Sequence, residues 1–226
     1  MCIRDSYYNI WEKELKGKRA VIQGWGNVGA AAGYYLTRQG VKIVGVIDRK
    51  GGFVNESGFS LKEIENLLNK RKEIVNLPGF KNYDELDQII WDTESEIFVP
   101  AAGSRLIKEH HIHSMVDSKL EVIACGANVP FADPEIFMGP ILAHADRNLS
   151  VIPDFISNCG MARTFAFLMG SEEKITDMSI FSDTSKTIET ALKELLINCP
   201  GGRGLVAEGL RIALRKITEL APVNAM

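Results

Sequence analysis

The apolar residues between positions 18 and 152 fall into short runs that alternate with amphipathic stretches. Runs at 20–22, 41–47, 97–99, 121–124 and 150–152 have the length of strands, and several are apolar at almost every position. Continuous apolar runs are typical of strands that are covered on both faces. Between them, residues 30–39 and the spacing of Leu61, Ile64, Leu67 and Leu68 favour helices with one apolar face. This alternation predicts a doubly wound parallel sheet with right-handed crossovers.

The strand pattern ends near Pro153, and helical patterns follow it. We expect helices at 161–169, at 186–198 with Thr184 or Ser185 as the cap, and at 205–220, with a turn at 200–204 before the last one. The sequence therefore predicts a sheet domain over residues 1–160 and a C-terminal helical segment over residues 161–226.

Composition narrows the class of protein. The 226 residues suffice for one α/β unit with an appendage, and 46% hydrophobic with 24% charged residues is ordinary for a globular chain. A net charge of −3 gives no electrostatic reason to bind nucleic acid or an anionic membrane. Apolar runs are too short to span a membrane, and the first residues do not resemble a signal peptide. We expect a cytoplasmic protein whose widely spaced cysteines, Cys2, Cys125, Cys159 and Cys199, are free thiols.

A glycine-rich turn carries the strongest chemical signal. Gly24, Gly26 and Gly29 form a G-x-G-x-x-G pattern directly after a predicted strand and directly before a predicted helix. In a Rossmann dinucleotide fold, the first glycine permits the turn, the second lets a diphosphate approach the backbone, and the third lets helix and strand pack closely. The diphosphate then lies at the positive end of the helix. We interpret Trp25 as a packing residue beside this turn.

An acidic residue occupies the end of the next strand. Asp48 lies 19 residues beyond Gly29, which is the spacing of an acid that accepts hydrogen bonds from the adenosine ribose. Its carboxylate disfavours a 2′-phosphate, whereas the adjacent Arg49 could pair with one. NAD is therefore favoured, and NADP stays open.

Further motifs occur in a fixed order along the chain, and together with the turn they resemble the Glu/Leu/Phe/Val dehydrogenase family of amino-acid dehydrogenases. They are residues 17–29, Asp48 with residues 51–52, residues 99–102, residues 126–130, and residues 151–154 leading to Asn158. The resemblance implies a Rossmann-like domain whose cofactor residues are Gly24, Gly26, Asn27, Val28, Gly29, Asp48, Arg49, Ala101, Ala102, Asn128 and Asn158.

The resemblance also implies an activity. Members of this family oxidise an L-amino acid such as glutamate, leucine, phenylalanine or valine to its 2-oxo acid, with hydride transfer to NAD, and the full-length enzyme is expected to be a homo-oligomer. The family's substrate-side pattern differs here at residues 158–161 and near Phe165, so the substrate preference is not carried over.

No catalytic residue is assigned to this chain. The chemistry needs a lysine of lowered pKa and a proton-shuttling carboxylate, and in the family both belong to a preceding substrate domain that no motif here matches. We expect an N-terminally truncated enzyme in which residues 1–6 are an artificial start and the helical segment packs on the absent domain. The alternative is a non-catalytic NAD(H)-binding module or sensor.

Two other features are expected to carry no chemistry. His110, His111 and His113 would lie on one helix at 105–116, at spacings that do not present a chelating face as i, i+4 would, so we expect a solvated helix end and no metal. Cys159 lies near the expected nicotinamide, but no motif supplies a base beside it, and we expect a small buried thiol.

Overall fold

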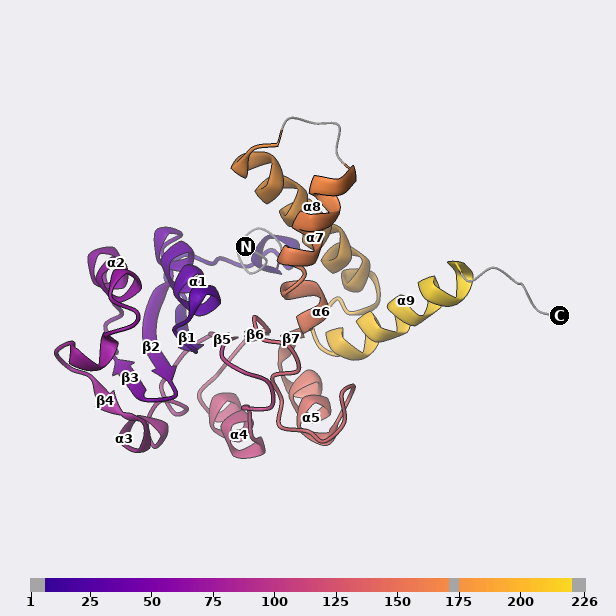
Figure 1. Ribbon diagram of the computed structural model, residues 1–226. Helices are drawn as coiled ribbons and strands as arrows, with labels where there is room; N and C mark the ends of the chain where they lie inside the picture. Colours follow the sequence, from indigo (N-terminus) through magenta and orange to yellow (C-terminus); the bar gives the residue numbers. More distant parts are fainter. Residues whose placement is uncertain (1–6, 171–174, 221–226) are drawn as a thin grey trace.

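The computed structural model describes residues 7–170 and 175–220, so the expectations about residues 1–6 and Cys2 lie outside the described residues. Within this part of the chain, seven strands form one sheet in the order β4-β3-β2-β1-β5-β6-β7 (Figure 1). The predicted parallel strands are all present: β1 (Arg19–Gln23), β2 (Lys42–Asp48), β5 (Ile97–Pro100), β6 (Val122–Ala124) and β7 (Ser150–Ile152). The predicted Rossmann-like doubly wound sheet is thereby confirmed.

Two antiparallel strands at one edge were not predicted. They are β3 (Gly51–Val54), which pairs with β2, and β4 (Lys81–Asn82), which pairs with β3. Their sequences lack the apolar alternation of a strand, because close backbone packing requires glycine in β3. A Cβ on Gly51 would lie 2.0 Å from the carbonyl oxygen of Lys81, and Gly51 has a φ of +129°.

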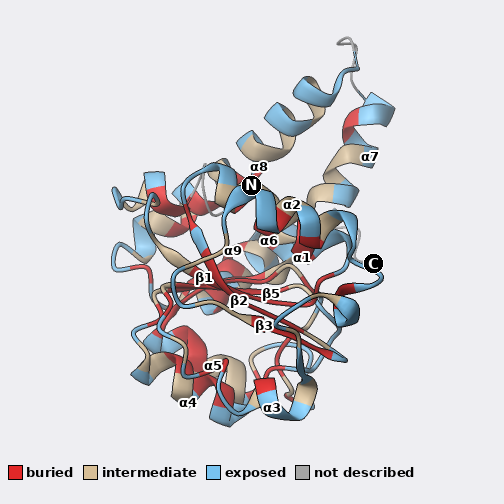
Figure 2. Ribbon diagram, turned by 90° about the vertical axis from the view of Figure 1, so that its left-hand side faces the viewer, coloured by how far each residue is buried: buried red, intermediate tan, exposed pale blue. Residues whose placement is uncertain are grey.

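Helices cover both faces of the sheet, as Figures 1 and 2 show. One face carries α1 (Asn27–Arg38) and α2 (Leu61–Asn69), and the other carries α3 (Tyr83–Asp87), α4 (Glu109–Asp117) and α5 (Pro140–Asn148). Alternate residues of the central strands enter the two cores: Ile97 and Val99 face the α1 side, and Phe98 faces the other. This two-sided burial explains the continuous apolar runs of the sequence.

The C-terminal region consists of α6 (Asp154–Ser157), α7 (Gly160–Gly170), α8 (Asp177–Asn198) and α9 (Leu205–Leu220). Helix α9 has the predicted bounds. Helix α8 begins at Asp177, earlier than predicted, because Thr176 caps it in a hydrogen-bonded capping box, so Thr184 and Ser185 lie inside the helix. The first turn of α9 is tied to the sheet domain by buried Asp146, whose carboxylate accepts from the backbone N–H groups of Val206 and Ala207 at 3.0 and 3.1 Å.

Helices α7 and α8 lie side by side and project from the sheet (Figure 2). An ion pair joins them, in which the Arg163 guanidinium donates two hydrogen bonds to the Asp183 carboxylate. Phe165, Leu168 and Met169 are exposed, whereas Phe167 is buried. Among the described residues, no helix combines the length and the apolar character needed to cross a bilayer.

Candidate functional site

The turn between β1 and α1 shows a distinct environment at each of its glycines. Gly24 has a φ of +93°, and a Cβ there would lie 2.6 Å from the backbone nitrogen of Ala102. A Cβ on Gly29 would lie 1.8 Å from the carbonyl oxygen of Gly24. A Cβ on Gly26, in contrast, would have no atom within 4 Å apart from those of Gly26 itself and its two chain neighbours. Packing therefore requires the outer two glycines, while the middle one borders open space.

That open space adjoins the N-terminus of α1. Gly26 is the N-cap residue, no side chain caps the helix, and its first turn contains no acidic residue. Asn27 and Val28 in this turn are exposed. Uncapped N–H groups and the positive end of the helix dipole together favour an anion such as a diphosphate.

Asp48 lies at the end of β2, directly beside the glycine turn. One of its carboxylate oxygens accepts from the backbone N–H of Trp25 at 2.8 Å, and the other accepts from that of Arg49 at 2.6 Å. Each oxygen keeps acceptor capacity, which suits the two hydroxyls of a ribose. Arg49 is exposed, and its guanidinium makes no hydrogen bond or ion pair with any other described residue.

Trp25 is a packing residue, as expected. Its ring is 2% exposed and lies against Gly33 of α1, where a Cβ would come within 2.7 Å of the indole. The indole N–H donates to the carbonyl oxygen of Leu67 in α2 at 3.0 Å. Trp25 therefore joins the two helices on this face and keeps the turn in place.

Backbone hydrogen bonds bring the loops after β5 and β6 to the same edge. The N–H of Ala101 donates to the carbonyl of Gln23 at 2.7 Å, and the N–H of Ala127 donates to that of Pro100 at 2.8 Å. A Cβ on Gly126 would lie 3.3 Å from the Val28 side chain. Ala101 and the exposed Ala102 thus lie next to the glycine turn, at the carboxyl ends of the parallel strands, where α/β sheets bind ligands.

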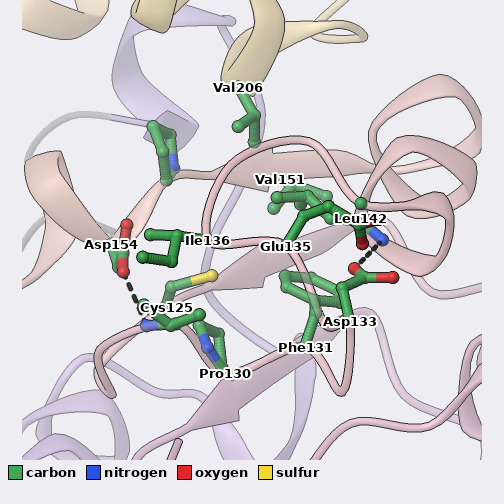
Figure 3. A pocket seen from close by; sticks show the side chains of 13 residues that line it. Cys125, Pro130, Phe131, Asp133, Glu135, Ile136, Leu142, Val151, Asp154 and Val206 are labelled. Atoms are coloured by element: carbon green, nitrogen blue, oxygen red, sulfur yellow. Dashed lines mark hydrogen bonds between the residues drawn. The ribbon is translucent and has the colours of Figure 1, made fainter. Parts of the chain in front are cut away.

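The two predicted asparagines contact each other although they are 30 residues apart. The side-chain amide of Asn158 donates to the side-chain oxygen of Asn128 at 2.7 Å. Asp154 supports this pair, because its carboxylate accepts from the backbone N–H of Val129 at 2.7 Å (Figure 3). The Ser157 hydroxyl also donates to the carbonyl of Cys125 at 2.5 Å. These roles of Asp154 and Ser157 were not predicted, although Asp154 lies in the motif at residues 151–154.

Two hollows flank this edge, and they differ greatly in size. A cavity of about 30 Å³ lies beneath the loop that follows β6, lined by Cys125, Phe131, Val151 and Val206 among others (Figure 3). It has room for one or two waters and none for a nucleotide. A groove of about 880 Å³ lies between α1 and α8, and its lining includes Val28 and Gly126 from the site described above. Its volume is in the range of ligand sites.

The thiol of Cys159 is half-buried, where a buried one was expected. Burial raises the pKa of Cys159, since desolvation disfavours the thiolate. A protonated thiol is a poor nucleophile, which agrees with the expectation that Cys159 has no covalent role.

The expectation of a solvated histidine end on α4 was wrong for His111. Its side chain is 1% exposed and stacks on Trp91 with the ring centroids 4.1 Å apart. The face of α4 that carries His111 packs against the sheet, which the charged flanking sequence did not indicate. His110 and His113 are exposed.

The chain is similar to known glutamate dehydrogenases. Over 151 residues, covering 65% of this chain and 32% of the relative, the chain is 30% identical to an NADP-specific glutamate dehydrogenase of Saccharolobus shibatae. Over 213 residues, covering 94% of this chain and 46% of the relative, it is 24% identical to a cryptic catabolic NAD-specific glutamate dehydrogenase of Bacillus subtilis.

A solved structure shares the fold. The hetero-hexameric glutamate dehydrogenase from Thermus thermophilus superimposes with a TM-score of 0.76 at 20% identity, covering 97% of this chain and 50% of that one. The chain thus spans between about a third and a half of the length of these proteins. Residues 1–199 match the family described as Glutamate/Leucine/Phenylalanine/Valine dehydrogenase. This chain therefore belongs to the Glu/Leu/Phe/Val dehydrogenase family.

Proposed function

We propose that the chain is the nicotinamide dinucleotide-binding part of an enzyme that oxidises an L-amino acid to its 2-oxo acid. The observation that carries this proposal is the glycine turn, where Gly26 borders open space between two glycines that packing requires. Asp48 is hydrogen-bonded to the same turn. Family membership supports the class of reaction.

In this proposal, most of the predicted residues would contact the cofactor. The diphosphate lies on the N-terminus of α1 beside Gly26, Asn27 and Val28. Asp48 accepts from the adenosine ribose hydroxyls. When bound, the cofactor would supply the hydride acceptor for oxidation of the amino acid. Ala101 and Ala102 would hold the nicotinamide half, Asn128 would contact its ribose, and Asn158 would bind its carboxamide.

The hydrogen bond between the two asparagines gives this assignment a physical basis. Asn158 donates one amide hydrogen to Asn128, which leaves its own carbonyl oxygen and a second amide hydrogen for a ligand. The nicotinamide carboxamide likewise carries a donor –NH2 group and an acceptor oxygen, so a paired asparagine can complement it. Because Asp154 fixes the Asn128 loop, the pair is preorganised.

We propose NAD as the preferred cofactor. The Asp48 carboxylate would repel the 2′-phosphate of NADP at the position where the ribose hydroxyls bind. Arg49, whose guanidinium has no partner among the described residues, is the group that could reverse this preference. The relatives include both NADP-specific and NAD-specific glutamate dehydrogenases, so the choice depends on this chain's own residues.

We propose that the catalytic lysine and carboxylate, and the opposite wall of the cleft, come from another part of the enzyme. The relatives are two to three times as long as the matched region, which leaves room for such a domain. The groove between α1 and α8 and the exposed apolar residues of α7 are the surfaces against which that domain would close. We also propose that the complete enzyme is a homo-oligomer.

Titration of the chain with NADH and with NADPH tests the cofactor assignment. We expect quenching of tryptophan emission, because Trp25 lies beside the turn. Asp48→Ala should weaken NADH binding at least about tenfold, which corresponds to about 1.4 kcal/mol, and should weaken NADPH binding less. Arg49→Ala is the matched control, which should weaken NADPH more than NADH.

Two outcomes would contradict the proposal. Absence of quenching by millimolar NADH in a folded sample would exclude dinucleotide binding. Equal losses for both cofactors in Asp48→Ala would show that the ribose contact is misassigned. A circular dichroism spectrum of each variant establishes that the sheet domain is intact.

A further inference from the structure

We propose that α4 and α5 form a surface site for a divalent transition metal, with Glu109, His113 and His144 as its ligands. One ligand atom from each of these residues lies within 4.8 Å of the others. Glu109 and His113 are four residues apart on α4, and His144 belongs to α5, which packs beside α4 on the sheet face opposite α1 (Figure 1).

The local geometry brings the three side chains to one point. An oxygen of Glu109 lies 3.9 Å from Nε2 of His113, across one helical turn. The imidazole rings of His113 and His144 have centroids 4.8 Å apart. Neither imidazole makes a hydrogen bond with another described residue, so the ring nitrogens are available to a ligand. The spacings among the histidines of α4 alone do not indicate this site, because the i, i+4 partner of His113 is a glutamate and the third residue comes from α5.

The donor set selects the class of metal. Two imidazole nitrogens and one carboxylate oxygen suit zinc, nickel or copper, whereas magnesium and calcium favour all-oxygen sites. Zinc–ligand bonds of about 2.0–2.1 Å require donor atoms roughly 3.3 Å apart in a tetrahedron. Glu109 and His113 are 68% and 57% exposed, so their side chains can rotate inward without disturbing the core.

Three protein ligands leave one coordination position for water. The site lies in the helix layer, away from the carboxyl edge of the sheet, so the metal would act as a cross-link between two helices. A ligand that binds only the folded chain raises its stability. The proposal is independent of the proposed function, because it depends on no residue of the cofactor edge.

Zinc binding measured by isothermal titration calorimetry tests the proposal. We expect one zinc ion per chain, and we expect His144→Ala and His113→Ala each to weaken binding at least about tenfold, since even the loss of a residue that only orients a ligand typically costs 10–100-fold. His110→Ala is the control, because this exposed histidine on the same helix lies outside the cluster. It should leave the affinity unchanged.

Thermal unfolding provides a second readout. Zinc at about 100 times its dissociation constant should raise the Tm of the unsubstituted chain by about 5 °C or more, and should not raise that of His144→Ala. The proposal would be overturned by equal losses in His110→Ala and His144→Ala, or by absence of one-to-one binding. Thiolate-to-cobalt charge-transfer absorption after cobalt loading would also overturn it, because the metal would then be on cysteine.

Discussion

Individual polar side chains keep the loops of the cofactor edge in place. The Asp48 carboxylate accepts hydrogen bonds from the backbone N–H of Trp25 in the turn and from that of Arg49 at the end of β2. The Asp154 carboxylate accepts one from the N–H of Val129. The φ of Val129 is +44°, a conformation that a β-branched residue rarely adopts without such support. In an irregular loop, a backbone N–H has no helix or strand partner. These carboxylates supply the hydrogen-bond acceptor in its place.

His111 is the residue whose charge state should most clearly affect stability. Its Nδ1 accepts from the backbone N–H of Lys108 at 3.2 Å, while its buried Nε2 has no hydrogen-bond partner among the described residues. The nearest carboxylate oxygen, on Asp87, is 4.0 Å away. Burial lowers the pKa of His111 to about 4 from the ordinary 6.5.

We expect the free energy of unfolding to decrease as the pH falls from about 6.5 to about 4. In this range the unfolded chain protonates His111 and the folded chain does not, so acid favours unfolding, by at most about 3 kcal/mol in total. Urea denaturation at several pH values measures this dependence. In His111→Phe, which retains a ring against Trp91, the dependence should be shallower. Parallel profiles for both proteins would contradict the assignment.

At the scale of elements, the junction of β1 with α1 is closely packed. The strand end, the glycine turn and the first turn of α1 are joined to β2 by the hydrogen bond from the N–H of Gly24 to the carbonyl of Ile47. A Cβ on Gly24 would meet the backbone of Ala101 and Ala102, and a Cβ on Gly29 would meet that of Gly24, whereas a Cβ on Gly26 would enter open space. Stability and ligand binding should therefore depend on different glycines of the same motif.

Substitution of Gly29 and Gly26 by alanine should separate these two roles. Gly29→Ala places a Cβ against backbone, so we expect a loss of at least about 2 kcal/mol in the free energy of unfolding. Gly26→Ala should cost under about 1 kcal/mol, the difference between glycine and alanine at an N-cap. It should nevertheless weaken NADH binding at least about tenfold. Denaturation and NADH titration of both variants measure this, and comparable destabilisation by the two substitutions would contradict it.

At the scale of the whole molecule, α7 and the N-terminal part of α8 project from the sheet (Figure 2), whereas Ile188, Leu192 and Leu195 of α8 are buried in the core. Phe165 is 57% exposed and Met169 is 88% exposed. Exposed apolar clusters of this kind promote association. Phe167 is buried, so only some of the apolar side chains of α7 are available for association.

The isolated chain should associate without turning over amino acids. Hydride transfer needs the substrate Cα within about 3–3.5 Å of the nicotinamide. The acid–base groups that we propose come from another part of the enzyme are worth about 10²–10⁴-fold in rate. Light scattering should show oligomers, which Phe165→Ser combined with Met169→Ser should reduce. Assays at 340 nm with a panel of L-amino acids should show no NADH formation. Steady turnover by a monomer would mean that catalytic groups lie within these residues.

The sequence by itself determined the parallel sheet, the glycine turn, the position of Asp48 and the bounds of α9. These features depend on local information: apolar periodicity reports two-sided burial, and glycine spacing reports a turn. The edge strands β3 and β4 could not be predicted from the pattern of apolar residues. Gly51 and Gly52 are needed there for close backbone contacts, and glycines contribute no apolar alternation.

Only the tertiary structure decided how distant residues meet. It paired Asn128 with Asn158, buried His111 against Trp91, and brought His144 of α5 to Glu109 and His113 of α4. Asp146 reaching the first turn of α9 is another such contact. Each depends on how elements pack across the sheet, and packing brings together residues that are far apart in sequence. Short segments of sequence contain no information about these contacts. Local patterns therefore predicted the fold more completely than its side-chain clusters.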